Sequence, residues 1–160
     1  MQKIVPFLWF NNQAEEAVNF YLSVFKNGKI ISMVRNGPNG PGPEGTVWSA
    51  VFELEGITFY ALNGGPMFSF TPAISLYIDC QTQEEIDEIW EKMTSDGGKP
   101  LSCGWVTDKF NLTWQVVPSQ LTKLLQDKDP VRAGRVNEVM MKMEKLIIKD
   151  LQDAYDGKIG

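Results

Sequence analysis

The sequence contains no histidine among its 160 residues. Histidine is the commonest metal ligand in proteins and the side chain that most often serves as a general base near neutral pH. Its absence excludes a Ser-His-Asp or Cys-His catalytic group and leaves a transition metal without its usual nitrogen donor. Any reaction at a site of this chain must therefore use carboxylates, amides, hydroxyls, amines or thiols.

Cysteine is scarce as well, and the two residues are Cys80 and Cys103. Two cysteines do not make the disulfide framework of a small secreted domain, so the sequence predicts a reducing, cytoplasmic environment. Because no histidine is present to activate either thiol, we interpret both as inert packing side chains. A reactive Cys103 beside Lys99 or Lys109 is the alternative.

Concentrated positive charge and long apolar runs are also missing. The net charge is −5 and arginine occurs only at Arg35, Arg132 and Arg135, so no basic stripe can neutralise the phosphates of a nucleic acid. No apolar run approaches the roughly 20 residues that a membrane-spanning helix needs. What remains is a globular composition, 43% hydrophobic and 22% charged, with a length that suits one domain over residues 1–160.

The first part of the chain has the pattern of a strand, a helix and three further strands. An apolar run at 4–10 has strand length, and Asn12 with Glu15 three residues later has the spacing of a capping box. Apolar residues at helical spacing predict an amphipathic helix over 13–25. The remaining predicted strands are 29–35, 46–54 and 57–63.

The same order of elements then restarts, which indicates an internal repeat. A strand at 73–80 precedes a second capping box, Thr82 with Glu85, and a second amphipathic helix. Aligning Tyr21 with Trp90 superposes the two units at an offset of 69 residues (90 − 21). The sequence thus predicts an α+β fold of duplicated βαβββ modules, with a first module at 1–66, a second at 72–118 and a C-terminal helical extension at 119–157.

The stretch 103–118 has the pattern of two strands joined by a turn. Trp114 and Val116 alternate with Thr113 and Gln115, so one face is expected to join the core and the other to offer an amide and a hydroxyl to a ligand. Asp108 and Lys109 of the turn are interpreted as an exposed ion pair that contributes little to stability.

The end of the chain predicts two helices. A short helix is expected over 119–126. Asp129 followed by Pro130 is typical of a helix start, and an apolar stripe predicts one longer helix from there to about Tyr155. That stripe must cover either the chain's own sheet or a second subunit.

Several short motifs follow one another along the chain: Pro6-Phe-Leu-Trp-Phe10, Ala14-Glu-Glu-Ala-Val-Asn-Phe-Tyr21, Ala61-Leu-Asn-Gly-Gly-Pro66, Cys103-Gly-Trp105, Asp108-Lys-Phe-Asn111, Trp114-Gln-Val-Val-Pro118 and Asp127-Lys-Asp-Pro-Val-Arg-Ala-Gly-Arg135. In these motifs the chain resembles the PhnB-like branch of the glyoxalase/bleomycin resistance (vicinal oxygen chelate) superfamily, with Asn111 where the family usually has glycine. The resemblance implies a half-open mixed β-barrel, the glyoxalase/bleomycin resistance/dioxygenase fold, with a pocket on its concave side.

The metal-dependent members of that superfamily carry their ligands on matched strands of the two modules. The resemblance maps those positions onto Pro6, Ser75, Gln115 and either Tyr60 or Ala61. Proline and alanine have no donor atom in the side chain, and a serine hydroxyl and a neutral amide are poor ligands for a transition metal. We therefore expect neither a metal nor a cofactor.

Proteins similar to this branch often carry the label 3-demethylubiquinone-9 3-methyltransferase. A typical methyltransferase binds S-adenosylmethionine at a glycine-rich turn of a doubly wound parallel sheet. The chain has no Gly-x-Gly-x-x-Gly motif and no alternating βαβα pattern, and Gly64-Gly65-Pro66 predicts only a turn. The residues themselves give the labelled activity no support.

The leading hypothesis is a homodimeric protein that binds a small organic molecule in a concave aromatic pocket without a metal. One alternative is an enzyme of the glyoxalase/dioxygenase superfamily in which Gln115, Ser75 and Tyr77 position a substrate, and another is sequestration of a bleomycin-type drug. A third is that the aromatic residues only fill the core. The predicted pocket residues are Trp48, Tyr60, Ser75, Tyr77, Trp105 and Gln115.

Overall fold

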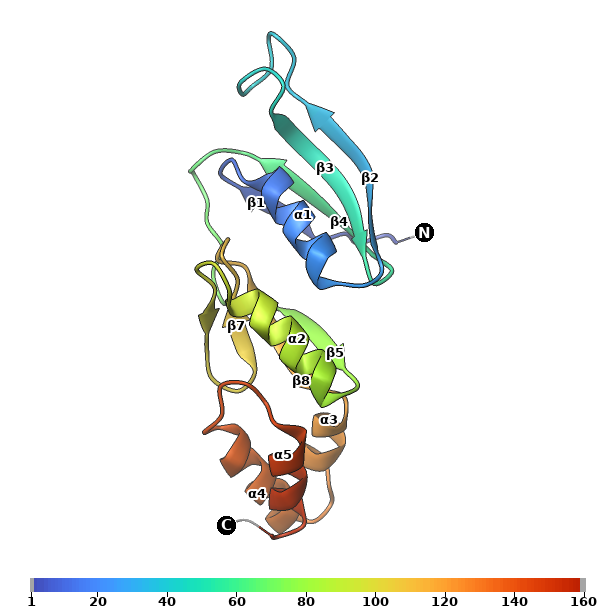
Figure 1. Ribbon diagram of the computed structural model, residues 1–160, viewed down its shortest axis with the longest axis vertical. Coiled ribbons are helices and arrows are strands. Elements are labelled where there is room, and N and C mark those ends of the chain that lie inside the picture. The colour runs from blue at the N-terminus through green and yellow to red at the C-terminus, as the bar shows by residue number, and fades with distance from the viewer. Residues whose placement is uncertain (1, 159–160) are drawn as a thin grey trace. The chain divides into compact units, whose positions relative to one another are not determined.

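The structure, a computed structural model, describes residues 2–158 and divides between Phe70 and Thr71 into two compact units. That boundary falls in the gap between the two predicted modules. Within the described residues, no helix has both the length and the apolarity that a membrane span requires. Figure 1 shows the helices and strands of both units.

The first unit is one βαβββ module. Its sheet has the strand order β1-β4-β3-β2, in which β1 is parallel to β4 and the other neighbours are antiparallel. The parallel pair requires a crossover, and α1 supplies it (Figure 1). The elements are β1 (Phe7–Phe10), α1 (Ala14–Val24), β2 (Gly28–Arg35), β3 (Val47–Leu54) and β4 (Ile57–Asn63).

The second unit repeats this topology, which confirms the predicted duplication. Its strand order is β5-β8-β7-β6, again with one parallel pair, β5 and β8. The fold is therefore α+β with two mixed four-stranded sheets and C-terminal helices. The elements are β5 (Leu76–Cys80), α2 (Gln83–Thr94), β6 (Lys99–Pro100), β7 (Trp105–Thr107) and β8 (Thr113–Pro118).

The two modules do not align at a single offset. The first residues of the two helices, Ala14 and Gln83, are 69 positions apart (83 − 14), as the sequence predicts. In the strands, however, Phe7 lies opposite Tyr60 as Tyr77 lies opposite Gln115, and these first strands are 70 positions apart (77 − 7). One extra residue between strand and helix in the first module accounts for the difference.

One face of the first sheet packs on α1 and buries an aromatic cluster. Tyr21 stacks on Phe52 with ring centroids 6.4 Å apart, and Phe52 stacks on Phe59 at 5.4 Å. All three side chains are buried. Each such ring removes a large apolar area from water, so the hypothesis that aromatic residues fill the core holds for this part of the chain.

The start of α1 is capped from a distant strand. The predicted cap by Asn12 is wrong, because the residue before the helix is Gln13 and its side chain makes no capping hydrogen bond. Instead Asn63, at the end of β4, accepts the Ala14 N–H at 2.8 Å through Oδ1. In α2 the local prediction is confirmed, since Thr82 Oγ1 accepts the N–H of Glu85 at 3.2 Å.

Asp108 lies buried in the turn between β7 and β8, so the prediction of an exposed ion pair is wrong in placing this carboxylate at the surface. Only 1% of the residue is exposed. Oδ1 accepts the backbone N–H groups of Phe110 and Leu112 at 2.8 and 3.1 Å, and Oδ2 accepts Nε1–H of Trp114 at 2.8 Å. Asn111 completes the turn at φ 66°, a left-handed conformation that asparagine tolerates.

The C-terminal apolar stripe forms a cluster on the second unit. Val117, Leu121, Val136, Leu146 and Leu151 pack together as one buried core, so the stripe covers the chain's own fold. The predicted single helix from 130 to 155 is wrong, because the chain leaves the helix after the first half. The helices are α3 (Gln120–Leu125), α4 (Pro130–Met140) and α5 (Ile148–Tyr155).

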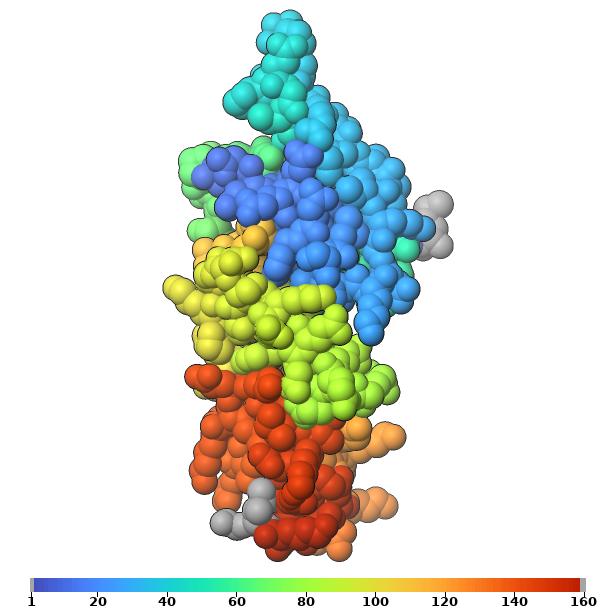
Figure 2. Space-filling model, viewed as in Figure 1, coloured from blue at the N-terminus to red at the C-terminus, as the bar shows by residue number. Residues whose placement is uncertain are grey.

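Backbone hydrogen bonds to the second sheet hold the interruption between α4 and α5. The N–H of Cys103 donates to the carbonyl of Met143 at 2.8 Å, and the N–H of Gly104 donates to Glu144 at 2.7 Å. The side chain of Gln83 in α2 accepts the N–H of Ile148 at 2.8 Å. Figure 2 shows the red C-terminal segment in contact with the yellow-green α2.

We predict that Asp108→Asn destabilises the protein by about 3 kcal/mol, because an amide cannot accept all three N–H donors and one of them is left buried and unpaired. Urea unfolding would measure this change. Asp129→Asn is the matched control: this residue caps α4 through a hydrogen bond to the Val131 N–H, and asparagine caps equally well. Equal stability of the two variants would contradict the role assigned to Asp108.

Candidate functional site

Three side chains form a row across the second sheet. Gln115 in β8 pairs with Tyr77 in β5 on one side and with Trp105 in β7 on the other. Directly opposed residues in neighbouring strands project to the same face, with Cβ atoms about 5 Å apart. The amide of Gln115 therefore lies between two aromatic rings. Tyr77 is 53% exposed, and Trp105 and Gln115 are half-buried.

The other face of this sheet belongs to the core. Val106, Trp114 and Val116 are buried there, and so are Ile86 and Met93 of α2. Because successive residues of a strand alternate between faces, the burial of Trp114 and Val116 fixes Gln115 on the face that α2 does not cover. The helix thus sets which face of the sheet carries the row.

Ser75, just before β5, extends the row with a hydroxyl. Its Oγ accepts a hydrogen bond of 2.8 Å from Nε2 of Gln115. A hydroxyl can donate or accept, and this contact occupies one end of the amide, so the other end remains for a ligand. Thr113, on the same face, is buried, and its Oγ1 has no hydrogen-bond partner within residues 2–158. The face therefore carries several uncharged polar groups between aromatic rings.

Four of the six predicted pocket residues lie together in the second unit, namely Ser75, Tyr77, Trp105 and Gln115. Tyr60 and Trp48 belong to the first unit. Tyr60 is 40% exposed and makes an edge-to-face contact with Phe7, with centroids 5.8 Å apart. Trp48 falls at an irregularity in the β2–β3 pairing and lines a separate cavity of that unit.

The two residues of β4 that the resemblance offers for the superfamily's metal-ligand position, Tyr60 and Ala61, lie on opposite faces of the strand. Ala61 is completely buried, whereas its neighbour Tyr60 projects to the opposite, partly exposed face. With the first strands 70 positions apart, Val5 rather than Pro6 corresponds to Ser75. Neither Val5 nor Ala61 has a donor atom in its side chain.

The residues at these positions do not fit a metal ion. The donors present are the hydroxyl of Ser75, the amide of Gln115 and the phenol of Tyr60, none of which is a good ligand for manganese, iron or zinc. Across residues 2–158, His, Cys, Asp and Glu side chains nowhere come together in a group of three or more that would hold a metal. A metal-dependent mechanism therefore has no support from the donor chemistry of this site.

The glycine pair after β4 serves packing rather than nucleotide binding. A Cβ atom on Gly64 would lie 2.3 Å from the indole of Trp9, so only glycine fits there. Nε1–H of Trp9 donates to the carbonyl of Gly65 at 2.9 Å, and Gly65 has φ 90°. This turn is thus built around a tryptophan side chain.

The two thiols differ in environment. Burial raises the pKa of Cys80 to about 12, and the negative charges of Glu85 and Asp79 add to the effect. Cys103 is partly exposed, and its sulfur lies 3.6 Å from Sδ of Met141. Cys80 is therefore almost entirely protonated near neutral pH, and any thiol chemistry has to come from Cys103.

The architecture and the comparisons define the class of protein. Two βαβββ modules with mixed sheets are the glyoxalase/bleomycin resistance fold. A fosfomycin resistance protein, FosX, from Listeria monocytogenes, solved in complex with Mn(II), shares this fold at 15% identity and a TM-score of 0.53, over 71% of this chain and 90% of that one. Protein PA1353 from Pseudomonas aeruginosa is similar at 20% identity and a TM-score of 0.61, over 74% and 98%.

The family within this superfamily is also clear. The family described as 3-demethylubiquinone-9 3-methyltransferase matches residues 2–117. A PhnB protein from Bacillus cereus is 42% identical, with a TM-score of 0.69, and the match covers 73% of this chain and 99% of that one. No curated protein matches the chain. The chain belongs to the 3-demethylubiquinone-9 3-methyltransferase (PhnB) family.

We predict that iodoacetamide modifies the native protein only at Cys103, because Cys80 is buried and its pKa is raised. Mass spectrometry of the intact protein near neutral pH should show one adduct, and Cys103→Ser should show none until denaturant is added. Labelling of Cys80 in the native protein would show that its surroundings are more open than described.

Proposed function

We propose that this protein binds a small, flat, uncharged organic molecule on the row formed by Tyr77, Gln115 and Trp105, without using a metal ion. The observation that carries the proposal is the strand register, which sets one amide between two aromatic rings on a face that α2 does not cover. A flat molecule placed there gains apolar contact with the rings and a directional hydrogen bond from the amide.

The chemistry of the row favours an uncharged ligand. The side chains of the row and of Ser75 beside it include no carboxylate, ammonium or guanidinium group, and a buried ion without a partner is costly. Asp79 follows on the same strand, but its carboxylate accepts a hydrogen bond of 3.3 Å from Nε2 of Gln81. A cationic drug of the bleomycin type would find little opposite charge at the row itself.

The second candidate is an enzyme that retains chemistry at this face. The 2.8 Å hydrogen bond between Gln115 and Ser75 supports it, because a fixed amide and hydroxyl would orient a polar substrate group. The family description names methyl transfer. The mixed sheets and the tryptophan packed against Gly64 offer no glycine-rich site for S-adenosylmethionine. We therefore rank methyl transfer below ligand binding at the row.

We also propose that the protein is a homodimer. Large apolar side chains are exposed on the first sheet, where Phe7 at 57% and Tyr60 at 40% contact each other edge to face. Apolar patches of this kind commonly mark association surfaces. Light scattering coupled to size exclusion would show twice the mass of an 18.0 kDa chain, and a monomer at all concentrations would contradict this part.

We predict that aromatic carboxamides and quinones, tested at millimolar concentration in a thermal-shift screen, include compounds that raise the melting temperature of the full chain. Gln115→Leu should weaken the binding of such a compound about tenfold, because the variant keeps the volume and loses the hydrogen bond. Tyr77→Ala should weaken it by a similar factor through lost ring contact.

The control variant is Gln120→Leu, the same substitution at an exposed position in the first turn of α3. It should bind as the unmodified protein does. Equal loss in both leucine variants, or a ligand that is indifferent to Gln115 and Tyr77, would remove the row as the binding site.

A further inference from the structure

A cavity of about 520 Å³ lies in the first unit, between the loop that joins β2 to β3 and the turns at the ends of β1 and β4. This volume is within the range of pockets that hold small molecules. It belongs to the first unit alone and shares no residue with the row of the second unit. Its walls include Asn11, Asn12, Asn36, Gly42, Trp48 and Asn63.

The lining contains four asparagines and no charged residue. Each asparagine amide offers two N–H donors and an acceptor oxygen, so the cavity can match ligand groups that both donate and accept. An ion would leave water for a wall without a counter-charge, which is unfavourable. The composition therefore selects uncharged, polar ligands.

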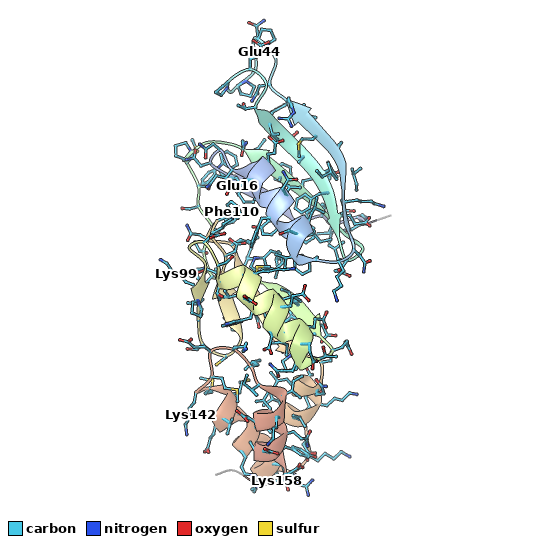
Figure 3. All side chains as sticks on the ribbon, in the orientation of Figure 1. Glu16, Glu44, Lys99, Phe110, Lys142 and Lys158 are labelled. Atoms are coloured by element: carbon cyan, nitrogen blue, oxygen red, sulfur yellow. The ribbon has the colours of Figure 1, made fainter. Side chains whose placement is uncertain are left out.

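The outer wall is a built structure. The N–H of Asn36 donates to the carbonyl of Thr46 at 2.8 Å, and Nη1 of Arg35 donates to the carbonyl of Gly45 at 3.1 Å. A Cβ atom on Gly42 would lie 2.8 Å from Nδ2 of Asn36, so the loop closes over this side chain only because glycine stands there. In Figure 3, Glu44 marks the outer tip of the loop.

One acceptor beside the cavity is left unused. Nδ2 of Asn36 donates to the hydroxyl and the carbonyl of Thr46 at 3.0 and 3.3 Å, and because a carbonyl only accepts, this fixes which end of the amide is the oxygen. That oxygen, Oδ1, is buried and has no hydrogen-bond partner within residues 2–158. Because this oxygen is buried against Gly40, which is outside the cavity lining, it belongs to the packing of the loop and is not offered to a ligand.

Of the other three asparagines, one is held by hydrogen bonds within the protein, and the side-chain amides of the other two are available to a ligand. Asn63 is occupied on both sides, since Oδ1 accepts the Ala14 N–H and Nδ2 donates to the Val47 carbonyl, each at 2.8 Å. Asn11 and Asn12 are exposed, and in the described part of the chain no group bonds to their amides. Asn63 thus fixes the inner wall, and its two neighbours remain for a ligand.

Trp48 gives the cavity an apolar surface. It is 44% exposed although tryptophan is usually largely buried, and no ring contact in the described residues covers its indole. An uncovered indole attracts a flat apolar face, such as the C–H face of a sugar ring, while amides at the edge bind the hydroxyls.

We propose that this cavity binds a neutral, hydroxyl-rich molecule of the monosaccharide class, with its ring on Trp48 and its hydroxyls on the amides of Asn11 and Asn12. The combination of uncharged amides, an exposed indole and an open cavity of small-molecule size supports this class over ions and over purely apolar ligands. The proposal is independent of the function proposed for the row at Gln115.

The test is a titration of the ¹⁵N-labelled full chain with D-glucose, D-galactose and N-acetyl-D-glucosamine, followed through the side-chain amides of Asn11 and Asn12 and the indole N–H of Trp48. At least one sugar should give saturable shifts at millimolar concentration. Trp48→Ala should weaken binding about tenfold and Asn12→Ala about fivefold. The control is Asn39→Ala, in the loop between β2 and β3 but outside the cavity lining, and it should leave binding unchanged.

The proposal would be overturned by no saturable shift with any of the three sugars, by equal weakening in Asn39→Ala, or by tighter binding of glucose 6-phosphate than of glucose. A sugar whose binding depends on Gln115 and not on Trp48 would also overturn it and would assign the ligand to the other site. Backbone amide spectra of each variant would establish that the fold is intact.

Discussion

The buried carboxylate of Asp108 is the constraint on which the second unit depends. It accepts two backbone N–H groups and one indole N–H, and these three hydrogen bonds set the path of the chain from β7 into β8. A carboxylate buried with fewer donors would be unfavourable, so the turn, the position of Trp114 and the strand register are stabilised together. Because Trp105 and Gln115 lie on those two strands, this carboxylate stabilises the part of the candidate site that they form.

Local sequence patterns predicted the helices and strands well, but they predicted poorly the hydrogen bonds between segments that are far apart in the sequence. Apolar periodicity was enough for the two modules, and the local cap of α2 formed as its spacing predicts. The cap of α1 did not, because Asn63 comes from a strand far along the sequence and replaces the neighbouring Asn12. The predicted C-terminal helix is interrupted between α4 and α5, where the carbonyl of Met143 accepts a hydrogen bond from the N–H of Cys103. No local sequence pattern predicts such a contact.

The candidate site shows the same division. The alternation of β8 was sufficient to place Gln115 and Trp114 on opposite faces. Tyr60 lies in the first unit and Tyr77 in the second. The alternation of residues along single strands therefore could not predict whether the two side chains share one pocket. Some aromatic residues fill the core and others are available for binding: Tyr21 and Phe52 are buried, and Tyr77 is exposed on a sheet face. Burial, which residue type alone does not determine, separates the two groups.

The row at Gln115 is proposed to bind its ligand with amide and ring contacts alone. Elemental analysis by mass spectrometry, on protein incubated with manganese, zinc, nickel and iron and then exchanged into metal-free buffer, tests it most directly. We expect far less than one metal ion per chain, and ligand binding that is unchanged by a chelator. Near-stoichiometric metal that Gln115→Leu removes would contradict the claim, because it would make this amide part of a metal site.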